Sequence, residues 1–452
     1  MNRLFIPALA FLALSISCSN QTSAPQLPLL KVSKSKTHLE TEDGSPFFWL
    51  GGTAWELFHR LSKEDATLYL ENRAKKGFTI IQAVVLAELD GLNTPNVYGH
   101  KPLINNNPTQ LNEPYFEHVD WVIKKAEALG LYIALLPTWG DKFNLAWGLG
   151  PEIFTPDNAF TFGVEIAKRY SDQSNIVWVL GGDRWPEDEE DRAIVNEMAA
   201  GIRSIDTKHL MTYHPGAGNL ASDQFDEPWL DFDMYQTGHD RNVKDYSFII
   251  RGKAKQRLLP IVNGEPRYEN HPNRFNPEEF GWLDAVDLRS AAWWTMLSGG
   301  AGFTYGSHDI WQMFDNEVDP INGARTHWKA SINLPGSKQM GIMKGFLTKF
   351  NWQDFKMHQK AIINDNPEDL THQIAAINKE RNVLIAYTPF GKELKLELSD
   401  LNLDVFHATW FNPRDGSFRY VGSFKDLEEI TLSPWSKGRG SDFVLVISKT
   451  QY

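Results

Sequence analysis

Residues 176–183 read Ile176-Val177-Trp178-Val179-Leu180-Gly181-Gly182-Asp183. A continuous run of β-branched and aromatic residues is typical of a strand that is buried on both faces of a parallel sheet. The two glycines that follow let the backbone turn sharply, which leaves the next carboxyl at the C-terminal end of the strand. The stretch therefore predicts an inner strand that ends in a reactive side chain.

The same pattern recurs along most of the chain. Seven further apolar runs lie at about residues 47–53, 79–86, 132–138, 210–214, 232–236, 259–263 and 302–305. Segments with helical periodicity lie between most of these runs, at residues 62–76, 114–129, 158–170, 190–205 and 283–297. Eight buried strands that alternate with helices predict a (β/α)8 barrel. The connections after the fifth and sixth of the eight runs are short for this pattern.

Both ends of the barrel segment carry β-type patterns. A small hairpin is predicted at its start, with a turn at Asp43-Gly44, so we expect the barrel domain to span residues 31–351. From residue 352 to residue 452 helical periodicity is lost, and this segment predicts an antiparallel β-sandwich. Its short alternating runs lie at residues 372–377, 383–389, 394–398, 408–411, 430–432 and 443–447.

The N-terminus reads as an export signal. Residues 1–17 combine Arg3 with an apolar run that is too short to span a bilayer, as in a signal peptide. Cys18, the single cysteine of the chain, follows directly and resembles the lipidated residue of a bacterial lipoprotein, with a polar linker over residues 18–30. We therefore expect export across the inner membrane and a lipid anchor that faces the periplasm or the cell surface. The alternative is a simple secreted protein with a chance cysteine.

Composition limits the partners of the protein. The 452 residues include 45 Lys and Arg against 57 Asp and Glu, a net charge of −12, and no basic cluster that would favour nucleic acid. The 16 Trp, 13 Tyr and 27 Phe suit a large core, flat ligands such as sugar rings, or both. Composition does not choose between these alternatives.

Two carboxyls are expected at the C-terminal ends of strands that lie across the barrel from each other. The fourth strand leads to Asp183, and the seventh leads to Glu265 through Asn263-Gly264-Glu265-Pro266. Two carboxyls that flank one bond are what glycoside hydrolysis needs, one as acid and one as nucleophile or base. The alternatives are structural: Asp183 as a helix N-cap or an ion pair with Arg184, and Glu265 as an ion pair with Arg267.

Signatures of other chemistries are missing from the sequence. It has no Gly-x-Ser-x-Gly elbow, no His-x-His or His-Glu-x-x-His metal motif, no Gly-x-x-x-x-Gly-Lys loop and no dinucleotide fingerprint. We therefore expect a hydrolase that needs neither a metal ion nor a cofactor.

Polar and aromatic residues gather at or just after the predicted strand ends, as in a carbohydrate cleft. Singly, each has a structural alternative, because a strand-end Trp can be core and a His can be a satisfied buried residue. The candidate substrate-binding residues are Trp55, Glu88, Asp90, Asn93, Tyr98, Trp139, Asp141, Lys142, Arg184, His214, Gln236, His239, Tyr268, Tyr305 and His308. Trp293-Trp294, inside a predicted helix, are interpreted as packing residues instead.

These motifs resemble the apiosidase-like glycoside hydrolases, family 140 and its relatives. The matching stretches include Phe48-Trp49-Leu50-Gly51-Gly52-Thr53-Ala54-Trp55, Asp90-Gly91-Leu92-Asn93, Pro137-Thr138-Trp139-Gly140-Asp141-Lys142, Gly181-Gly182-Asp183-Arg184, Asn263-Gly264-Glu265-Pro266 and Tyr305-Gly306-Ser307-His308. The resemblance runs from about residue 32 to the C-terminus and includes a sandwich that is often labelled collagen-binding. It implies that Asp183 and Glu265 are catalytic. Thr237 stands where the family more often has Ser.

The best-known activity in that family is removal of apiose from the plant pectin rhamnogalacturonan-II, and many relatives have no assigned substrate. The resemblance and the residues together predict a glycosidase acting on a plant cell-wall-type glycan, with Asp183 as general acid/base and Glu265 as nucleophile. The placement of the two carboxyls favours a retaining mechanism, with a separation of about 5–5.5 Å; inversion needs about 6.5–9.5 Å. The alternative function is a non-catalytic carbohydrate-binding surface lipoprotein.

Overall fold

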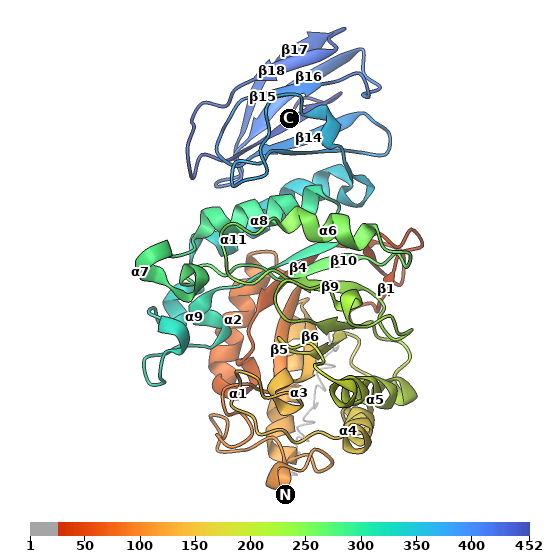
Figure 1. Ribbon diagram of the computed structural model, residues 1–452, viewed down its shortest axis with the longest axis vertical. Helices are drawn as coiled ribbons and strands as arrows, with labels where there is room; N and C mark the ends of the chain where they lie inside the picture. Colours follow the sequence, from red (N-terminus) through yellow and green to blue (C-terminus); the bar gives the residue numbers. More distant parts are fainter. Residues whose placement is uncertain (1–25) are drawn as a thin grey trace, which may run out of the picture.

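The computed structural model describes residues 26–452, so the expected signal peptide and Cys18 lie outside the described residues. Its larger domain is an eight-stranded parallel sheet in the order β8-β7-β6-β5-β4-β11-β10-β9 (Figure 1). All eight predicted strands are present, which confirms the barrel. The strands are β4 (Trp49–Thr53), β5 (Ile80–Leu86), β6 (Tyr132–Thr138), β7 (Ile176–Gly181), β8 (Met211–His214), β9 (Asp233–Gln236), β10 (Ile261–Glu265) and β11 (Gly302–Tyr305).

The barrel closes between β8 and β9 without a ladder between these two strands. The loop after β8 takes the place of a neighbour, because Gly218 donates its N–H to the Gln236 carbonyl at 2.9 Å. A side chain also crosses the gap, since the Thr212 hydroxyl donates to the Phe232 carbonyl at 2.7 Å. We call this junction the β8–β9 seam.

Helices cover the outside of the barrel (Figure 1). The five predicted helices are α2 (Lys63–Lys75), α3 (Glu113–Ala128), α4 (Pro156–Tyr170), α5 (Glu189–Ile205) and α8 (Ala285–Leu297). Two further helices of nine or more residues, α6 (Asp245–Lys253) and α11 (Pro335–Leu347), were not predicted from the periodicity. Four one-turn helices were not predicted either: α1 (Leu57–Arg60), α7 (Pro277–Phe280), α9 (His308–Trp311) and α10 (Trp328–Ser331). The short connection after the sixth strand thus still holds a helix, α6, whereas the connection before that strand holds only the 3-10 turn η3 (Ala221–Asp223).

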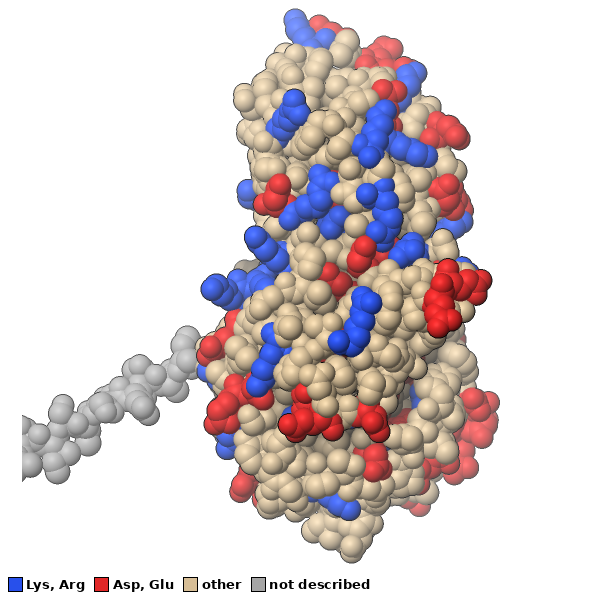
Figure 2. Space-filling view, turned by 90° about the vertical axis from the view of Figure 1, so that its left-hand side faces the viewer, with Lys and Arg blue, Asp and Glu red and all other residues tan. Residues whose placement is uncertain are grey.

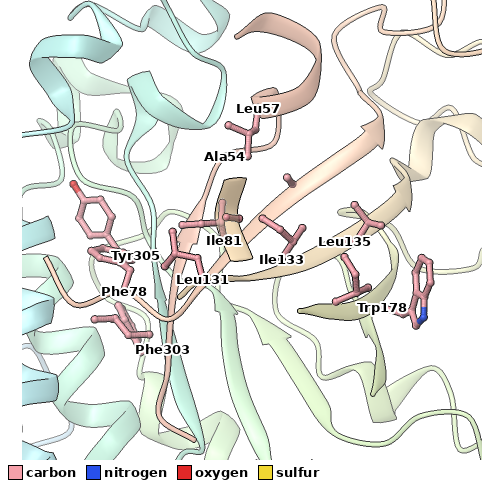
Figure 3. Close-up of a cluster of buried hydrophobic side chains, with 14 of the residues drawn as sticks. Ala54, Leu57, Phe78, Ile81, Leu131, Ile133, Leu135, Trp178, Phe303 and Tyr305 are labelled. Atoms are coloured by element: carbon pink, nitrogen blue, oxygen red, sulfur yellow. The ribbon is translucent and has the colours of Figure 1, made fainter. Parts of the chain in front are cut away.

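Alternate residues of the strands face two different cores. Along β7, Val177 and Val179 pack inside the barrel, whereas Trp178 and Leu180 belong to the cluster between the strands and the helices. Figure 3 shows Trp178 in this outer cluster together with Leu135 and Ile133, and Tyr305 beside Phe78. The direction of a side chain therefore depends on the parity of its position in the strand.

A small antiparallel sheet adjoins the interior core of the barrel. It contains β1 (Leu30–Val32), β2 (Leu39–Thr41) and β3 (Pro46–Phe47), so the predicted hairpin is part of a three-stranded sheet. Phe47 meets Tyr132 edge-on with ring centroids 5.1 Å apart, and Leu39 is fully buried in the same cluster as the barrel interior.

The C-terminal domain is a set of antiparallel sheets, as predicted. Six strands run in the order β12-β13-β14-β19-β16-β17, and β15 pairs with β18 in a second sheet. The strands are β12 (Lys356–Met357), β13 (Ile374–Ile377), β14 (Val383–Thr388), β15 (Leu394–Glu397), β16 (Val405–Phe411), β17 (Phe418–Lys425), β18 (Glu429–Leu432) and β19 (Phe443–Ser448). The edge strand β17 was missed, because all of its side chains are at least partly exposed.

The sandwich is fixed to the barrel mainly through α8. Arg289 forms a buried ion pair with Asp442, with Nη2 and Oδ1 2.7 Å apart. Trp293 stacks on Tyr387, and Trp294 donates its indole N–H to the His372 carbonyl at 3.0 Å. Both tryptophans are buried, which confirms their interpretation as packing residues.

On the face shown in Figure 2, acidic and basic side chains are interspersed, and neither sign of charge covers the whole face. Within residues 26–452, no helix combines the length and the apolar character that a membrane span requires.

Candidate active site

Asp183 is presented by an unusual backbone turn at the end of β7. Gly181, Gly182 and Asp183 all have positive φ angles, of 85°, 120° and 55°. A Cβ atom on Gly181 would lie 2.5 Å from the Tyr213 ring, and one on Gly182 would lie 2.8 Å from the Trp139 ring. Both glycines are therefore required by conformation and by space. The turn aims the Asp183 carboxyl at the mouth of the barrel, and such strained residues are frequent at functional sites.

The Asp183 carboxyl lies in a polar but poorly solvated position. Its Oδ2 accepts a hydrogen bond from the Trp147 indole at 3.1 Å and lies 3.8 Å from an Arg184 nitrogen. Burial, followed by the negative charge of Glu265, raises the pKa of Asp183 to about 6. The carboxyl is therefore protonated over a wider pH range than an ordinary aspartate.

Glu265, the last residue of β10, is 5% exposed and lies against two imidazoles. Its Oε2 is 3.0 Å from His214 Nε2, and its Oε1 is 3.4 Å from His239 Nε2. Burial alone would raise the pKa of Glu265, but the contacts with His214 and His239 outweigh it and hold the pKa below its ordinary value. Glu265 is therefore ionised under conditions in which Asp183 keeps its proton.

His214, the last residue of β8, connects the two carboxyl-bearing residues. Its Nδ1 accepts the backbone N–H of Asp183 at 3.2 Å, so the proton of the neutral ring is on Nε2, which faces Glu265. The ring is enclosed by Trp55 and Trp139, with centroids 5.3 and 5.9 Å from its own. His214 thus fixes the position of Glu265 relative to the Asp183 turn.

Three more predicted residues surround the pair. Gln236, beside Glu265 in the β9–β10 register, lies close enough to Asp183 for its side-chain amide to offset part of the rise in the pKa of Asp183. Burial and the nearby Glu265 carboxylate raise the pKa of Tyr268 well above its usual range. Burial and four neighbouring carboxyls, including Asp183 and Glu265, also raise the pKa of Glu88 well above its ordinary value. Glu88 therefore belongs to the same electrostatic cluster.

Tyr305 and His308, which were predicted to bind substrate, do not face this cluster. Tyr305 points outward from β11, is 1% exposed, and donates its hydroxyl hydrogen to Glu269 at 2.6 Å. His308 uses both ring nitrogens internally: Nε2 contacts the Ile321 carbonyl at 3.1 Å and Nδ1 accepts from the Trp311 indole. The alternation of side-chain directions along a strand explains why Tyr305 points outward, since its neighbour Thr304 is the residue that faces inward.

The loop after β5 uses its predicted polar residues for its own structure. Asp90 accepts the Asn93 amide N–H at 2.8 Å, and Asn93 in turn accepts from Asn106. The Tyr98 hydroxyl accepts the backbone N–H of Lys63 at the start of α2. These three side chains shape the loop, and the structure does not bring them to the carboxyl pair.

Asp141 and Lys142 form a fully buried ion pair, with Oδ1 and Nζ 2.6 Å apart. Oδ2 of Asp141 accepts the backbone N–H of Gly150 at 2.9 Å, so the pair supports the loop of residues 143–150. Both side chains, which were predicted to contact substrate, therefore lie buried beneath this loop.

Two of the three structural alternatives for the carboxyls fail, whereas the ion pair between Asp183 and Arg184 is present, with Oδ2 and Nη1 3.8 Å apart. Asp188, and not Asp183, caps α5, because its side chain accepts the N–H of Asp191. Arg267 forms its ion pair with Asp245 and not with Glu265.

Sequence reasoning missed Trp147 and Trp185. Trp147 is 61% exposed and touches Asp183, and Trp185 lies beside it with ring centroids 6.3 Å apart. The available signal was a tryptophan followed by glycine, Trp147-Gly148, in the loop between β6 and α4. Among the described side chains, no group of three or more His, Cys, Asp and Glu is arranged to hold a metal ion.

Both domains of the chain are similar to known proteins. The apiosidase-like catalytic domain model matches residues 33–354, and the model described as "Putative collagen-binding domain of a collagenase" matches residues 358–448. A solved glycoside hydrolase is 29% identical, with a TM-score of 0.86 over 94% of this chain and 98% of its own. No curated protein matches the chain.

Two further solved structures are similar. A family 5 glycoside hydrolase from Bacteroides vulgatus is 29% identical, with a TM-score of 0.86 over 93% of both chains. A family 39 glycoside hydrolase from Bacteroides cellulosilyticus shares the fold at 11% identity, with a TM-score of 0.52 over 89% of this chain and 81% of its own. The family model over the barrel and the two solved structures at 29% identity show that the protein is a glycoside hydrolase. The chain belongs to the apiosidase-like family.

Proposed function

We propose that the protein is a retaining glycosidase that cleaves a plant cell-wall-type glycan, with Asp183 as general acid/base and Glu265 as nucleophile. The observation that carries this assignment is the opposite effect of the surroundings on the two carboxyls. The pKa of Asp183 is raised to about 6, whereas that of Glu265 is lowered. Paired carboxyls with separated pKa values are typical of an acid and a nucleophile that act on one bond.

In the first step, the Glu265 carboxylate attacks the anomeric carbon while Asp183 gives its proton to the leaving oxygen. In the second step, Asp183 takes a proton from water, and the resulting hydroxide displaces Glu265 from the anomeric carbon. His214 and His239 hold the Glu265 carboxylate during both steps, since they contact one carboxylate oxygen each. The two inversions give net retention.

The apiosidase-like family supports pectic glycans, with rhamnogalacturonan-II side chains first among them, as substrates. The Cys18 lipid anchor expected from the sequence would hold the enzyme outside the inner membrane, where such glycans arrive.

Sugar release from a panel of pectic and hemicellulosic glycans, rhamnogalacturonan-II included, tests the proposal. The wild-type enzyme should release one monosaccharide, and Glu265→Gln should release none while keeping its circular dichroism spectrum. NMR of the first product formed should show the anomeric configuration of the substrate. An active Gln variant would remove Glu265 from the mechanism. Binding of a glycan without release would favour the binding-protein alternative.

A further inference from the structure

The loop of residues 143–150 is held rigidly at the edge of the site. Asp141 accepts the N–H groups of Leu149 and Gly150 at 3.2 and 2.9 Å. Arg184, 2% exposed, donates to the carbonyl groups of Asn144 and Leu145 at 2.9 and 3.1 Å. Buried charged groups thus fix both ends of the loop, and the tip residue Trp147 is pre-positioned.

Trp147 has one covered face and one open face. The Arg184 guanidinium lies 4.1 Å from the centroid of the indole and covers one of its two faces. The side chain is nevertheless 61% exposed, and its Nε1 donates to Asp183 Oδ2 at 3.1 Å. An exposed tryptophan held in this way has no evident role in stability, because little apolar area is removed from water.

Trp185 extends the aromatic surface beside Trp147. Their rings are inclined by 62°. The Trp185 ring packs against Gly216, where an added Cβ would come within 2.2 Å of it. One indole therefore contacts the carboxyl of Asp183 and the other lies beside the first, and their positions are set by Arg184 and by Gly216.

We propose that Trp147 and Trp185 form the platform for the sugar ring of the leaving group, and that Trp147 also directs the proton of Asp183 to Oδ1. The leaving group that suits this platform is a glycan residue, because the electron-rich face of an indole attracts the polarised C–H groups of a pyranose or furanose ring. The proposal builds on the proposed role of Asp183 as the acid, since the acid stands on the leaving-group side of the bond.

The second part follows from the chemistry of the donor. An indole N–H can only donate, so Oδ2 must remain an acceptor and the carboxyl proton is carried by Oδ1. A donor to Oδ2 also favours the ionised form, which lowers the pKa of Asp183 relative to a site without it. Trp147 is thus a positioning residue for the acid.

The kinetic test uses two substrates. One is the panel glycan from which the wild type releases most sugar, and the other is the glycosyl fluoride of that sugar, whose leaving group has no ring. Trp147→Ala should lower kcat/KM for the glycan about 100-fold, because platform and donor are both lost, but lower it less than about 3-fold for the fluoride, which needs little acid catalysis. Trp435→Ala is the matched control, because Trp435 is an exposed tryptophan of the sandwich.

Two further variants separate the platform from the donor. Trp147→Phe keeps a ring and loses the N–H, so the alkaline limb of kcat/KM should shift to higher pH. Trp185→Ala should raise KM for the glycan about 10-fold with the alkaline limb unchanged. Equal losses on the glycan and the fluoride, or no shift of the limb in Trp147→Phe, would overturn the inference.

Two measurements need no turnover. Tryptophan emission should titrate near pH 6 in the wild type, and this transition should be absent in both Trp147→Phe and Asp183→Asn. In gels that contain each panel glycan, the Glu265→Gln protein should be retarded, and adding Trp147→Ala should remove the retardation. If no glycan is cleaved but both results appear, the proposed function fails while the platform stands. An unchanged titration or unchanged retardation would refute the platform.

Discussion

Asp183 and Glu265 carry the same functional group, and their neighbours give them different protonation states. Cleavage requires Asp183 protonated and Glu265 ionised, so the pKa of Asp183 sets the alkaline limit of kcat/KM. We expect kcat/KM to fall as the pH rises through about 6, the pKa of Asp183. The acid limb should lie below pH 4.5, because the pKa of Glu265 is lowered from that value. Initial rates between pH 3.5 and 8.5 test this, and a flat profile from pH 5 to 8 would contradict it.

The same shifts predict opposite effects on stability. Folded Asp183 binds its proton more tightly than the unfolded chain, so its contribution to stability is present below pH 3.8 and is lost as the pH rises through about 6. Asp183→Asn removes that loss, and we expect it to raise Tm at pH 7.5 by about 2 °C, with a smaller difference at pH 5.

Glu265→Gln is the matched control for this prediction. The lowered pKa of Glu265 stabilises the fold above pH 4.5, and this stability is lost as the pH falls through the folded pKa. Glu265→Gln should therefore lower Tm at pH 7.5. Differential scanning calorimetry measures both variants, and a change of the same sign in both would refute the assignment.

At the scale of single elements, the turn after β7 is the part of the site that tolerates change least. We expect Gly182→Ala to lower kcat by about 100-fold, because a Cβ at φ 120° meets the Trp139 ring and displaces the adjacent acid. Gly345→Ala in α11 is the control, since an added Cβ there meets no atom within 4 Å. Equal activity of the two variants would show that the turn does not set the position of Asp183.

The elements that could be predicted from the sequence are those with a clear period. The inner strands and five of the six helices longer than ten residues were predicted, whereas α11 was missed despite its 13 residues, α6 has only nine residues, and β17 lacks a buried face. The predicted strand ends also gave the correct positions of Asp183 and Glu265 in the barrel. Tyr305 was misplaced because nearness to a strand end does not reveal which face a residue takes. Trp147 was missed because its position depends on Arg184, which no local pattern indicates.

At the scale of the whole molecule, α8 joins the two domains through a buried ion pair and two buried tryptophans. Removing one partner of the buried pair Arg289–Asp442 leaves the other charge unpaired. We expect Asp442→Asn to destabilise the protein by about 3 kcal/mol and to lower the unfolding temperature of barrel and sandwich together. Guanidinium unfolding followed by tryptophan fluorescence tests this. Two separate transitions, with only the sandwich affected, would show that the domains fold independently.

At the β8–β9 seam the two strands are not joined by a ladder of hydrogen bonds, and the candidate active site spans this seam. His214 ends β8 on one side, while Gln236 and Glu265 stand on the other. A bound glycan that touches both sides of the seam would hold the two strands together. Binding at the site and closure of the barrel would therefore be thermodynamically linked. Backbone amides along the seam should therefore exchange with deuterium faster than those of β5 and β6 in the free enzyme. Substrate bound to the Glu265→Gln variant should slow exchange at the seam more than anywhere else in the barrel.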